Sequence, residues 1–315
     1  MKTLKDTGEF STIERLRSLL PAGEDKSPGD DCAVVQTTDN TSFDWLLTSD
    51  PVIEGIHFDS STDPLSIGYK AIGRALSDLA AMGGEPYWAL INIVAPSETD
   101  VSRLEEIYKG ATSIAAKFDL AIVGGDISMG KTLELHVFAA GRVPADCAVY
   151  RKGAEPGNII YVTGSLGGSF KRKHLSFQPR VTEGIWLRSE SWPTSMIDIS
   201  DGLASDLRHI ISPTETGAEL DIAKIPISPE ALSMKDNISA LNHALCDGED
   251  FELLFTIPAS KTELFESSWK DTFDLACTAI GRITDKKDEI EMADKNGKHT
   301  ILKNKGYEHF ISNIA

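Results

Sequence analysis

The chain has 315 residues, of which 41% are hydrophobic and 25% are charged, a composition typical of globular proteins with room for two domains. Its net charge of −17 argues against a basic nucleic-acid-binding surface, and no apolar run reaches the roughly 18 residues of a transmembrane helix. The first residues carry charges where a signal peptide is apolar, and four scattered cysteines without a CxxC pair favour a reducing cytoplasm. We therefore expect a cytoplasmic protein with neither nucleic acid nor membrane as partner.

Strands and helices are predicted to alternate along the chain. Short apolar runs bounded by Gly, Pro or Asp indicate strands, and amphipathic patterns between them indicate helices. In chain order we predict a strand at 44–48, a helix at 64–82, a strand at 88–95, a helix at 98–118, strands at 121–123, 159–163 and 195–199, a helix at 201–211 and a strand at 252–257. This order predicts an α/β or α+β fold.

The predicted helix at 64–82 has clear boundaries, with Asp63 as its N-cap and Gly83 after its last turn. Asp78 lies off the apolar stripe of this helix, on a face of small residues. This position predicts a carboxylate that closely approaches another group. The alternative is a surface ion pair between Arg74 and Asp78, which are four residues apart.

The segment 143–158 is rich in Pro, Gly and charged residues, as is typical of a linker. It predicts two domains, residues 1–145 and residues 146–315. A Gly-rich stretch, VTGSLGGS at 162–169, follows a predicted strand and has two open readings. It forms either a tight turn at the start of the second domain or a phosphate contact.

Residues 125–132 match the phosphate-binding pattern GxxxxGK[ST]. That motif requires a helix directly after it, because the helix N-terminus and the loop amides bind the phosphates. Here Leu133, Leu135 and Val137 alternate with other residues, which predicts a strand. We therefore reject a P-loop and expect Lys131 to lie in a hairpin.

Acidic residues recur beside Gly, Ser or Thr near the ends of predicted strands, where open sheets bind ligands. Mg²⁺ prefers carboxylate oxygens and shares them with substrate phosphates. Because two like charges about 4 Å apart repel by roughly 4 kcal/mol at an effective dielectric of about 20, gathered acids would need cations. The acids concerned are Asp30, Asp31, Asp50, Asp78, Asp126, Asp198 and Asp201. Together they predict a divalent-metal site for phosphoryl transfer, whereas each alone is explained equally well as a turn or cap residue.

These acids lie within motifs that follow one another through almost the whole chain. The most specific are EGIHF at 54–58, DISDGL at 198–203, GED at 248–250 and GYEHF at 306–310, and they occur together with the more general SDLAAMG at 77–83. In this order they resemble the thiamine-monophosphate kinase family, from the superfamily that includes aminoimidazole ribonucleotide synthetase.

The resemblance implies a two-domain α/β fold like that of aminoimidazole ribonucleotide synthetase. Residues 1–145 would bind metal and ATP and share a β-barrel in a homodimer, and residues 146–315 would form an α/β domain that completes the substrate and nucleotide site. The implied reaction is the Mg²⁺-assisted, in-line transfer of the γ-phosphoryl group of ATP to thiamine monophosphate, giving thiamine diphosphate.

The resemblance also implies roles for individual residues. The expected metal ligands are Asp31, Thr48, Ser49, Asp50, Asp78, Asp126, Asp198 and Asp201, and those expected to serve catalysis are Asp50, Asp78 and Asp126. The expected ATP contacts are Tyr108, Arg151 and Ser200. The expected contacts to the thiamine end are His57, Glu249 and Tyr307. No nucleophilic side chain is needed, because positioning and charge stabilisation carry phosphoryl transfer.

Two features depart from the family pattern. FKRKHLSFQPR at 170–180 follows the second Gly-rich stretch where the family has a helical segment, and Ala75 stands where the family tends to have Asn. Two alternative functions stay open. One is another ATP-dependent synthetase of the superfamily, and the other is a non-catalytic binder of nucleotide or metal.

Overall fold

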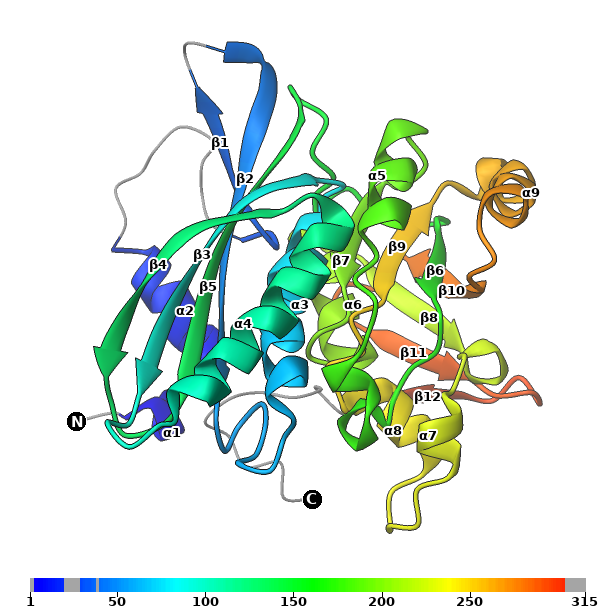
Figure 1. Ribbon diagram of the computed structural model, residues 1–315. Coiled ribbons are helices and arrows are strands. Elements are labelled where there is room, and N and C mark those ends of the chain that lie inside the picture. Colours follow the sequence, from blue (N-terminus) through cyan, green and yellow to red (C-terminus); the bar gives the residue numbers. More distant parts are fainter. Residues whose placement is uncertain (1–2, 20–28, 38–39, 304–315) are drawn as a thin grey trace.

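The computed structural model describes residues 3–19, 29–37 and 40–303. Within them the chain forms two β-sheets with helices packed between and around them (Figure 1). The helices are α1 (Leu4–Thr7), α2 (Glu9–Arg17), α3 (Pro64–Ala81), α4 (Val101–Ala115), α5 (Val181–Ser189), α6 (Leu203–Ile211), α7 (Pro229–Leu232), α8 (Ala240–Cys246) and α9 (Thr262–Thr272). The mixed α/β class predicted from the sequence is confirmed.

The first sheet contains the strands that precede residue 145. Its order is β1 (Ala33–Thr37), β2 (Asn40–Ile53), β5 (Glu134–Pro144), β3 (Glu85–Ala95) and β4 (Ala121–Met129). All neighbouring strands in it are antiparallel except β3 and β4, which are parallel because α4 crosses between them.

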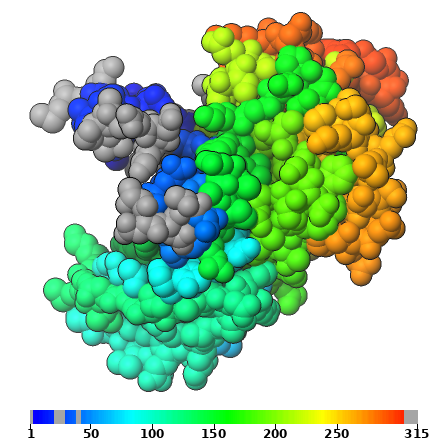
Figure 2. Space-filling view, turned by 90° about the horizontal axis from the view of Figure 1, so that it is seen from above, coloured from blue at the N-terminus to red at the C-terminus, as the bar shows by residue number. Residues whose placement is uncertain are grey.

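The second sheet contains the strands that follow residue 158. Its order is β12 (His299–Ile301), β11 (Ile290–Ala293), β8 (Gly217–Asp221), β10 (Cys277–Thr284), β6 (Ile159–Thr163), β9 (Leu253–Ile257) and β7 (Ser195–Asp198). Viewed from above, the cyan residues around α3 and α4 and the orange residues of α9 lie on opposite sides of the molecule, with green residues between them (Figure 2).

The strands and helices predicted in chain order are confirmed, most of them with shifted ends. The predicted strand at 44–48 is the centre of the longer β2, and the predicted helix at 98–118 is α4 followed by a short 3₁₀ turn. The rejection of a P-loop is also supported, because β5 and not a helix follows Gly130 and Lys131.

The hairpin expected around Lys131 is wrong. Strands β4 and β5 are not neighbours, because β3 lies between them and pairs with both. The alternation of Leu133, Leu135 and Val137 identified a strand correctly but carried no information about its partner. The connection at Lys131 therefore passes across the end of β3.

Helix α3 lies between the two sheets and carries SDLAAMG in its last turns. Its N-cap is Asp63, whose carboxylate accepts a hydrogen bond from the Ser66 amide at 3.0 Å, as the sequence predicted. The helix packs against β2 and β5 of the first sheet and against β7 and α5 of the second half. On its other side, Gly68 allows close contact with α4, since a Cβ there would lie 1.8 Å from the carbonyl oxygen of Ile107.

One apolar core joins the inner face of the first sheet to the second sheet through α3. It includes Leu46 on β2, Ile72 and Leu76 on α3, and Tyr161 and Phe255 on β6 and β9. Because these side chains are almost fully buried, the position of α3 relative to both sheets is fixed by packing. Among the described residues, no helix combines the length and the hydropathy that a membrane crossing requires.

Candidate metal and nucleotide site

Three carboxylates from distant parts of the sequence meet beside α3. Asp31 precedes β1, Asp78 lies on α3, and Asp198 is the last residue of β7. One oxygen atom from each lies within 4.8 Å of the others. The strand ends and the helix face that the sequence analysis singled out are therefore brought to one point.

Two acids of this group are held in an environment that opposes their charge. Burial, followed by repulsion from Asp50 and Asp198, raises the pKa of Asp78 well above its ordinary range. Burial and the charge of Asp31 raise the pKa of Asp198 to about 8. A divalent cation would reverse both effects, because it favours the ionised carboxylates.

Neighbouring donors hold these carboxylates in place. The hydroxyl of Thr48 donates to Asp78, and the hydroxyl of Ser77 donates to Asp198 at 2.6 Å. Arg151 binds Asp31 through two nitrogens, Nη2 at 2.8 Å and Nε at 3.2 Å. Thr48, expected near the metals, and Arg151, expected to contact ATP, thus both lie at the acidic group.

Ser49 is placed differently from its neighbours on β2. Side chains alternate along a strand, and Ser49 is exposed whereas Thr48 is buried. Its hydroxyl therefore faces away from Asp78, on the outer face of the first sheet. Asp50 faces the same side as Thr48 and is held by Arg74, whose Nη2 lies 3.1 Å from its carboxylate.

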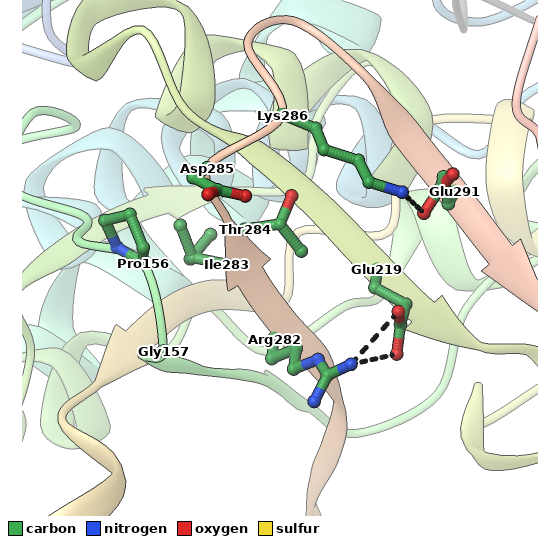
Figure 3. Close-up of a pocket in the computed structure, with 9 residues that line it drawn as sticks. All are labelled: Pro156, Gly157, Glu219, Arg282, Ile283, Thr284, Asp285, Lys286 and Glu291. Atoms are coloured by element: carbon green, nitrogen blue, oxygen red, sulfur yellow. Dashed lines mark hydrogen bonds and ion pairs between the residues drawn. The ribbon is translucent and has the colours of Figure 1, made fainter.

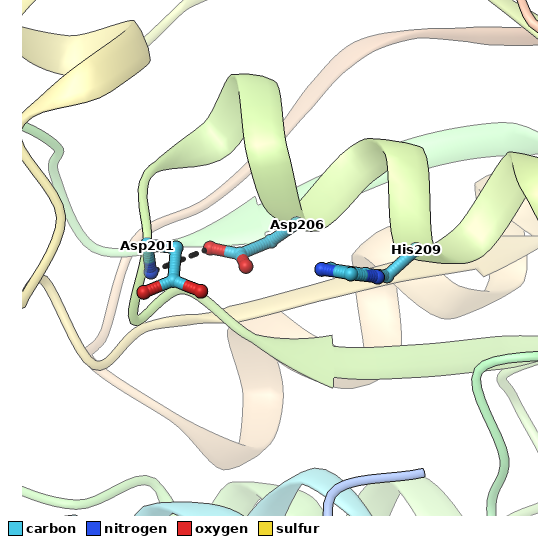
Figure 4. A group of neighbouring side chains, drawn as sticks. All are labelled: Asp201, Asp206 and His209. Atoms are coloured by element: carbon cyan, nitrogen blue, oxygen red, sulfur yellow. Dashed lines mark hydrogen bonds between the residues drawn. The ribbon is translucent and has the colours of Figure 1, made fainter. Parts of the chain in front are cut away.

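A second group with metal-binding side chains adjoins the first, at the start of α6 (Figure 4). Asp206 and His209, both on α6, point toward Asp201, whose backbone amide donates to Asp206 at 3.1 Å. Burial and the charge of Asp201 raise the pKa of Asp206 well above its ordinary range. Burial, with the charge of Arg151, lowers the pKa of His209 to about 4, so its imidazole is neutral and able to ligate a metal.

Asp206 and His209 were not predicted from the sequence. They are three residues apart in the helix that follows DISDG, and this spacing places both on one face of α6, next to Asp201. The alternative reading of Asp201 as a helix cap is not supported, because the N-cap of α6 is Gly202. Ser200 lies in the same turn, and its carbonyl oxygen accepts from the Glu249 amide at 2.7 Å.

The acid of the GED motif is already balanced by basic side chains. Glu249 accepts hydrogen bonds from Lys70 Nζ at 2.6 Å and from Arg74 Nη1 at 3.0 Å, and its carboxylate lies 3.2 Å from His174 Nδ1. Burial alone would raise the pKa of Glu249, but His174 and the two cations outweigh it and lower the pKa to about 2. His57 lies beside this cluster, since its carbonyl oxygen accepts from Lys70 at 2.7 Å.

The predicted alternative, an ion pair between Arg74 and Asp78, is therefore wrong, because Arg74 pairs with other acids. The guanidinium of Arg74 extends to Asp50 and Glu249, which come from β2 and from the loop before β9. Sequence spacing along one helix could not reveal these partners, because both contacts depend on tertiary packing.

The second Gly-rich stretch forms a turn that binds protein carboxylates. The amide of Gly167 donates to both oxygens of Asp250, at 2.9 and 3.0 Å, and the amide of Gly168 donates to Asp247 at 2.8 Å. These donors are engaged, so the tight-turn reading is supported over the phosphate contact. The following residues form two 3₁₀ turns, Ser169–Lys171 and Lys173–Leu175, where the family was expected to have a helix.

Tyr108 and Asp126 line a cavity of about 780 Å³ between α4 and β4. Its walls are mostly apolar, with Val101, Leu104 and Ile127 among them. A cavity of this size and character suits a flat heterocycle of a nucleotide. Tyr108 and Asp126, assigned to ATP and metal, thus lie together.

Asp126 lies apart from the three-carboxylate group. It is exposed on β4, where it pairs with Asn92 of β3. Across the same sheet, Asn92 pairs with His136 of β5, and His136 pairs with Pro51 of β2. Three strand spacings therefore separate it from the residue next to Asp50, roughly 14 Å. Tyr307, the remaining expected contact, lies outside the described residues.

A separate cavity of about 410 Å³ lies at the other end of the second sheet (Figure 3). Its carboxylates are already paired, Glu219 with Arg282 at 3.1 Å and Glu291 with Lys286 at 2.7 Å. His299 Nδ1 lies 3.8 Å from the carboxylate of Glu291, but both carboxylates already form ion pairs with Arg282 and Lys286. We assign no ligand to this cavity.

Known proteins resemble the chain over nearly its full length. Residues 29–143 match the family profile of the N-terminal domain of AIR synthase related proteins. The thiamine-monophosphate kinase of Buchnera aphidicola (subspecies Acyrthosiphon pisum) is 34% identical, covering 91% of this chain and 93% of that protein. The thiamine-monophosphate kinase of Escherichia coli K12 is 32% identical, covering 97% and 99%.

Solved structures extend the comparison to the fold. AaThiL complexed with AMPPCP and TMP is 30% identical, with a TM-score of 0.85, and covers 98% of this chain and 99% of its own. The hydrogenase maturation protein HypE in complex with ATP has a TM-score of 0.69 at 16% identity, covering 95% of this chain and 96% of its own. The second similarity concerns the fold alone.

We predict that the protein without divalent metal loses stability as the pH rises. The pKa of Asp198 is about 8 in the folded protein, against an ordinary value of 3.8. Its contribution to the unfolding free energy is therefore fully present below about pH 4 and is lost as the pH rises to about 8. The unfolding free energy of the unaltered protein in EDTA should therefore fall between about pH 6 and pH 9. Asp198→Asn should reduce this fall by about 3 kcal/mol, measured by urea titration.

Asp126→Asn is the matched control, because it makes the same chemical change at an exposed carboxylate. Its pH dependence should equal that of the unaltered protein. Equal slopes for the Asp198→Asn variant and the unaltered protein would contradict the account of the acidic group.

Proposed function

Because the chain belongs to the thiamine-monophosphate kinase family, we propose that it transfers the γ-phosphoryl group of ATP to thiamine monophosphate, giving thiamine diphosphate. The observation that carries this function on the chain itself is the convergence of Asp31, Asp78 and Asp198 within 4.8 Å beside α3. Acids gathered next to an arginine, with the pKa values of Asp78 and Asp198 raised, are suited to handle phosphates only together with divalent cations.

The residues present fit Mg²⁺. Their donors are hard oxygens, and burial without a counter-cation is unfavourable for them. The residues proposed to hold the ions are Asp31, Asp50, Asp78, Asp198 and Asp201, with Asp206 added from the structure. When bound, Mg²⁺ would neutralise phosphate oxygens and so stabilise the charge of the transferring group.

The chain's own side chains orient the nucleotide. We propose that the base lies in the cavity lined by Tyr108 and that Asp126 lies near the phosphates at its edge. Arg151 is held by Asp31 through Nε and Nη2, and we propose that the remaining N–H groups of its guanidinium contact the phosphates. Ser200 lies in the turn that follows β7 and is proposed to contact the nucleotide from there. No side chain needs to act as nucleophile, because the acceptor phosphate attacks in line.

The thiamine end is proposed to lie near His57 and Glu249, with Tyr307 as a further contact. Since Lys70 and Arg74 already balance Glu249, this acid does not act as a lone counter-charge for the thiazolium. We propose instead that Glu249 organises the pocket wall through its three partners.

We also propose that the chain divides into residues 1–145 and 146–315 and that the first part forms a homodimer. Residues 145–158 connect the two sheets. On β3, Trp88 and Leu90 alternate with the buried Ala89 and Ile91, so large apolar side chains are exposed on the outer face of the first sheet. Exposed apolar faces of this kind are typical of protein–protein interfaces.

Leu90→Lys should weaken this dimer by at least about 2 kcal/mol, roughly 30-fold in Kd, because it places a charge in the apolar face. Leu264→Lys is the matched control, since Leu264 is exposed on α9, away from the first sheet. Sedimentation velocity across a concentration series measures both. An unchanged dimer in Leu90→Lys, or a monomeric unaltered protein, would contradict the proposed interface.

The function is tested by incubating the purified protein with ATP, Mg²⁺ and thiamine monophosphate and quantifying thiamine diphosphate. We expect product that disappears in EDTA, and a loss of turnover of at least about 100-fold in Asp78→Asn. ATP binding without product would contradict the kinase. It would favour another ATP-dependent synthetase of the superfamily or a non-catalytic binder.

A further inference from the structure

Arg74 joins two groups that are proposed to serve different ligands. From α3, its Nη2 donates to Asp50 Oδ1 at 3.1 Å and its Nη1 donates to Glu249 Oε1 at 3.0 Å. Asp50 belongs to the acids proposed to hold metal, and Glu249 lies at the proposed thiamine end. The guanidinium therefore lies at the boundary between the two.

The side chain is a permanent cation that is only partly exposed. It is 14% exposed, and the ring of Phe251 lies 5.7 Å from its guanidinium carbon. Burial would lower the pKa of Arg74, but the charges of Asp50 and Glu249 outweigh burial and raise it above its ordinary range. Arginine thus keeps its charge here at every physiological pH.

One donor of this cation is left over. The Nε atom of Arg74 is buried and has no hydrogen-bond acceptor among the described residues. A buried N–H without an acceptor is unfavourable, so an acceptor that reached this atom would stabilise the side chain. Lys70 differs in this respect, because its amine already contacts His57, Glu249 and His174 at 2.6 to 2.9 Å.

The position of Arg74 has two electrostatic consequences. A guanidinium bound to Asp50 repels a dication at the same carboxylate, so it lowers the affinity of Asp50 for metal. Because Arg74 bridges Asp50 and Glu249, a phosphate held between the proposed metal and thiamine ends would lie near this guanidinium. A planar guanidinium suits phosphate oxygens, and Nη1 and Nη2 each carry a second N–H besides the one directed at Glu249 or Asp50.

We propose that Arg74 is a fixed cation that weakens divalent-metal binding at Asp50 and binds the phosphate of the acceptor. The identity of the acceptor as thiamine monophosphate rests on the proposed function. The effect on metal binding rests on the contact between Arg74 and Asp50 and on the proposed role of Asp50 as a metal ligand.

The test compares Arg74→Gln, Arg74→Lys and the unaltered protein. Arg282→Gln is the matched control, because Arg282 also pairs with a carboxylate but lies on β10, at the separate cavity of the second sheet. Mn²⁺ binding to the nucleotide-free protein is measured by electron paramagnetic resonance. Steady-state kinetics then give KM for thiamine monophosphate and for ATP separately.

We expect Arg74→Gln to bind Mn²⁺ about tenfold more tightly, because a positive charge is removed. Its KM for thiamine monophosphate should rise about tenfold or more, whereas KM for ATP changes less than about twofold. Arg74→Lys should keep the Mn²⁺ affinity of the unaltered protein and still raise KM for thiamine monophosphate, because it lacks the fork. Arg282→Gln should change none of these quantities.

Unchanged or weaker Mn²⁺ binding by a folded Arg74→Gln variant would overturn the metal part of the proposal. Unchanged KM for thiamine monophosphate in Arg74→Lys would overturn the phosphate part, and this variant decides it even if Arg74→Gln does not fold. Absence of turnover in the unaltered protein would contradict the proposed function instead, while the Mn²⁺ comparison would still decide the role of Arg74 at Asp50.

Discussion

Repulsion among the carboxylates beside α3 is the constraint on which the rest of the structure depends. Asp31, Asp78 and Asp198 cannot all be ionised at such short separation without a cation, and burial adds to the cost. The fold nevertheless places them on three elements that meet at one point. Each carboxylate also has a donor, Thr48, Ser77 or Arg151, that holds its oxygens in place. A divalent cation would stabilise such an arrangement, as expected of a ligand site and not of a structural ion pair.

Helix α3 makes this arrangement possible, because it is packed against both sheets and cannot shift toward either. The glycine at 68 brings α4 close on one side, and Lys70 and Arg74 bind the loop that precedes β9 on the other. The same helix thus carries Asp78, which is proposed to hold metal, and two cations, Lys70 and Arg74, which lie near the proposed thiamine end. Charge is therefore distributed along α3, positive toward its middle and negative near its C-terminal end. A substrate phosphate that moves between these regions would meet opposite charges at either end of its path.

Much of the architecture could be predicted from the sequence because it depends on local signals. Asp63 as N-cap and the period-two pattern after Lys131 required only neighbouring residues. The motif that carries Asp78 was recognised by its setting in the chain. The partner of β5 could not be predicted in this way, since alternation is the same for any neighbouring strand. Lys70 and His174 were missed for a related reason, because their partner Glu249 is far away in the sequence and a lysine or histidine alone is explained equally well as a solvated residue. Asp206 and His209 follow Asp201 closely in the sequence, but their burial beside it depends on tertiary packing.

The most direct test of the acidic site is thermal unfolding of the apo-protein under Mg²⁺ titration, without any substrate. The account predicts that the unaltered protein gains several degrees in Tm as Mg²⁺ rises into the millimolar range, because the ion binds the folded state alone. We expect little or no gain for Asp78→Asn. In EDTA at about pH 8, the Tm of this variant should be at least as high as that of the unaltered protein, because one buried charge is removed. Equal Mg²⁺ responses in the two proteins, or a large loss of stability in Asp78→Asn without metal, would contradict the central role of these carboxylates.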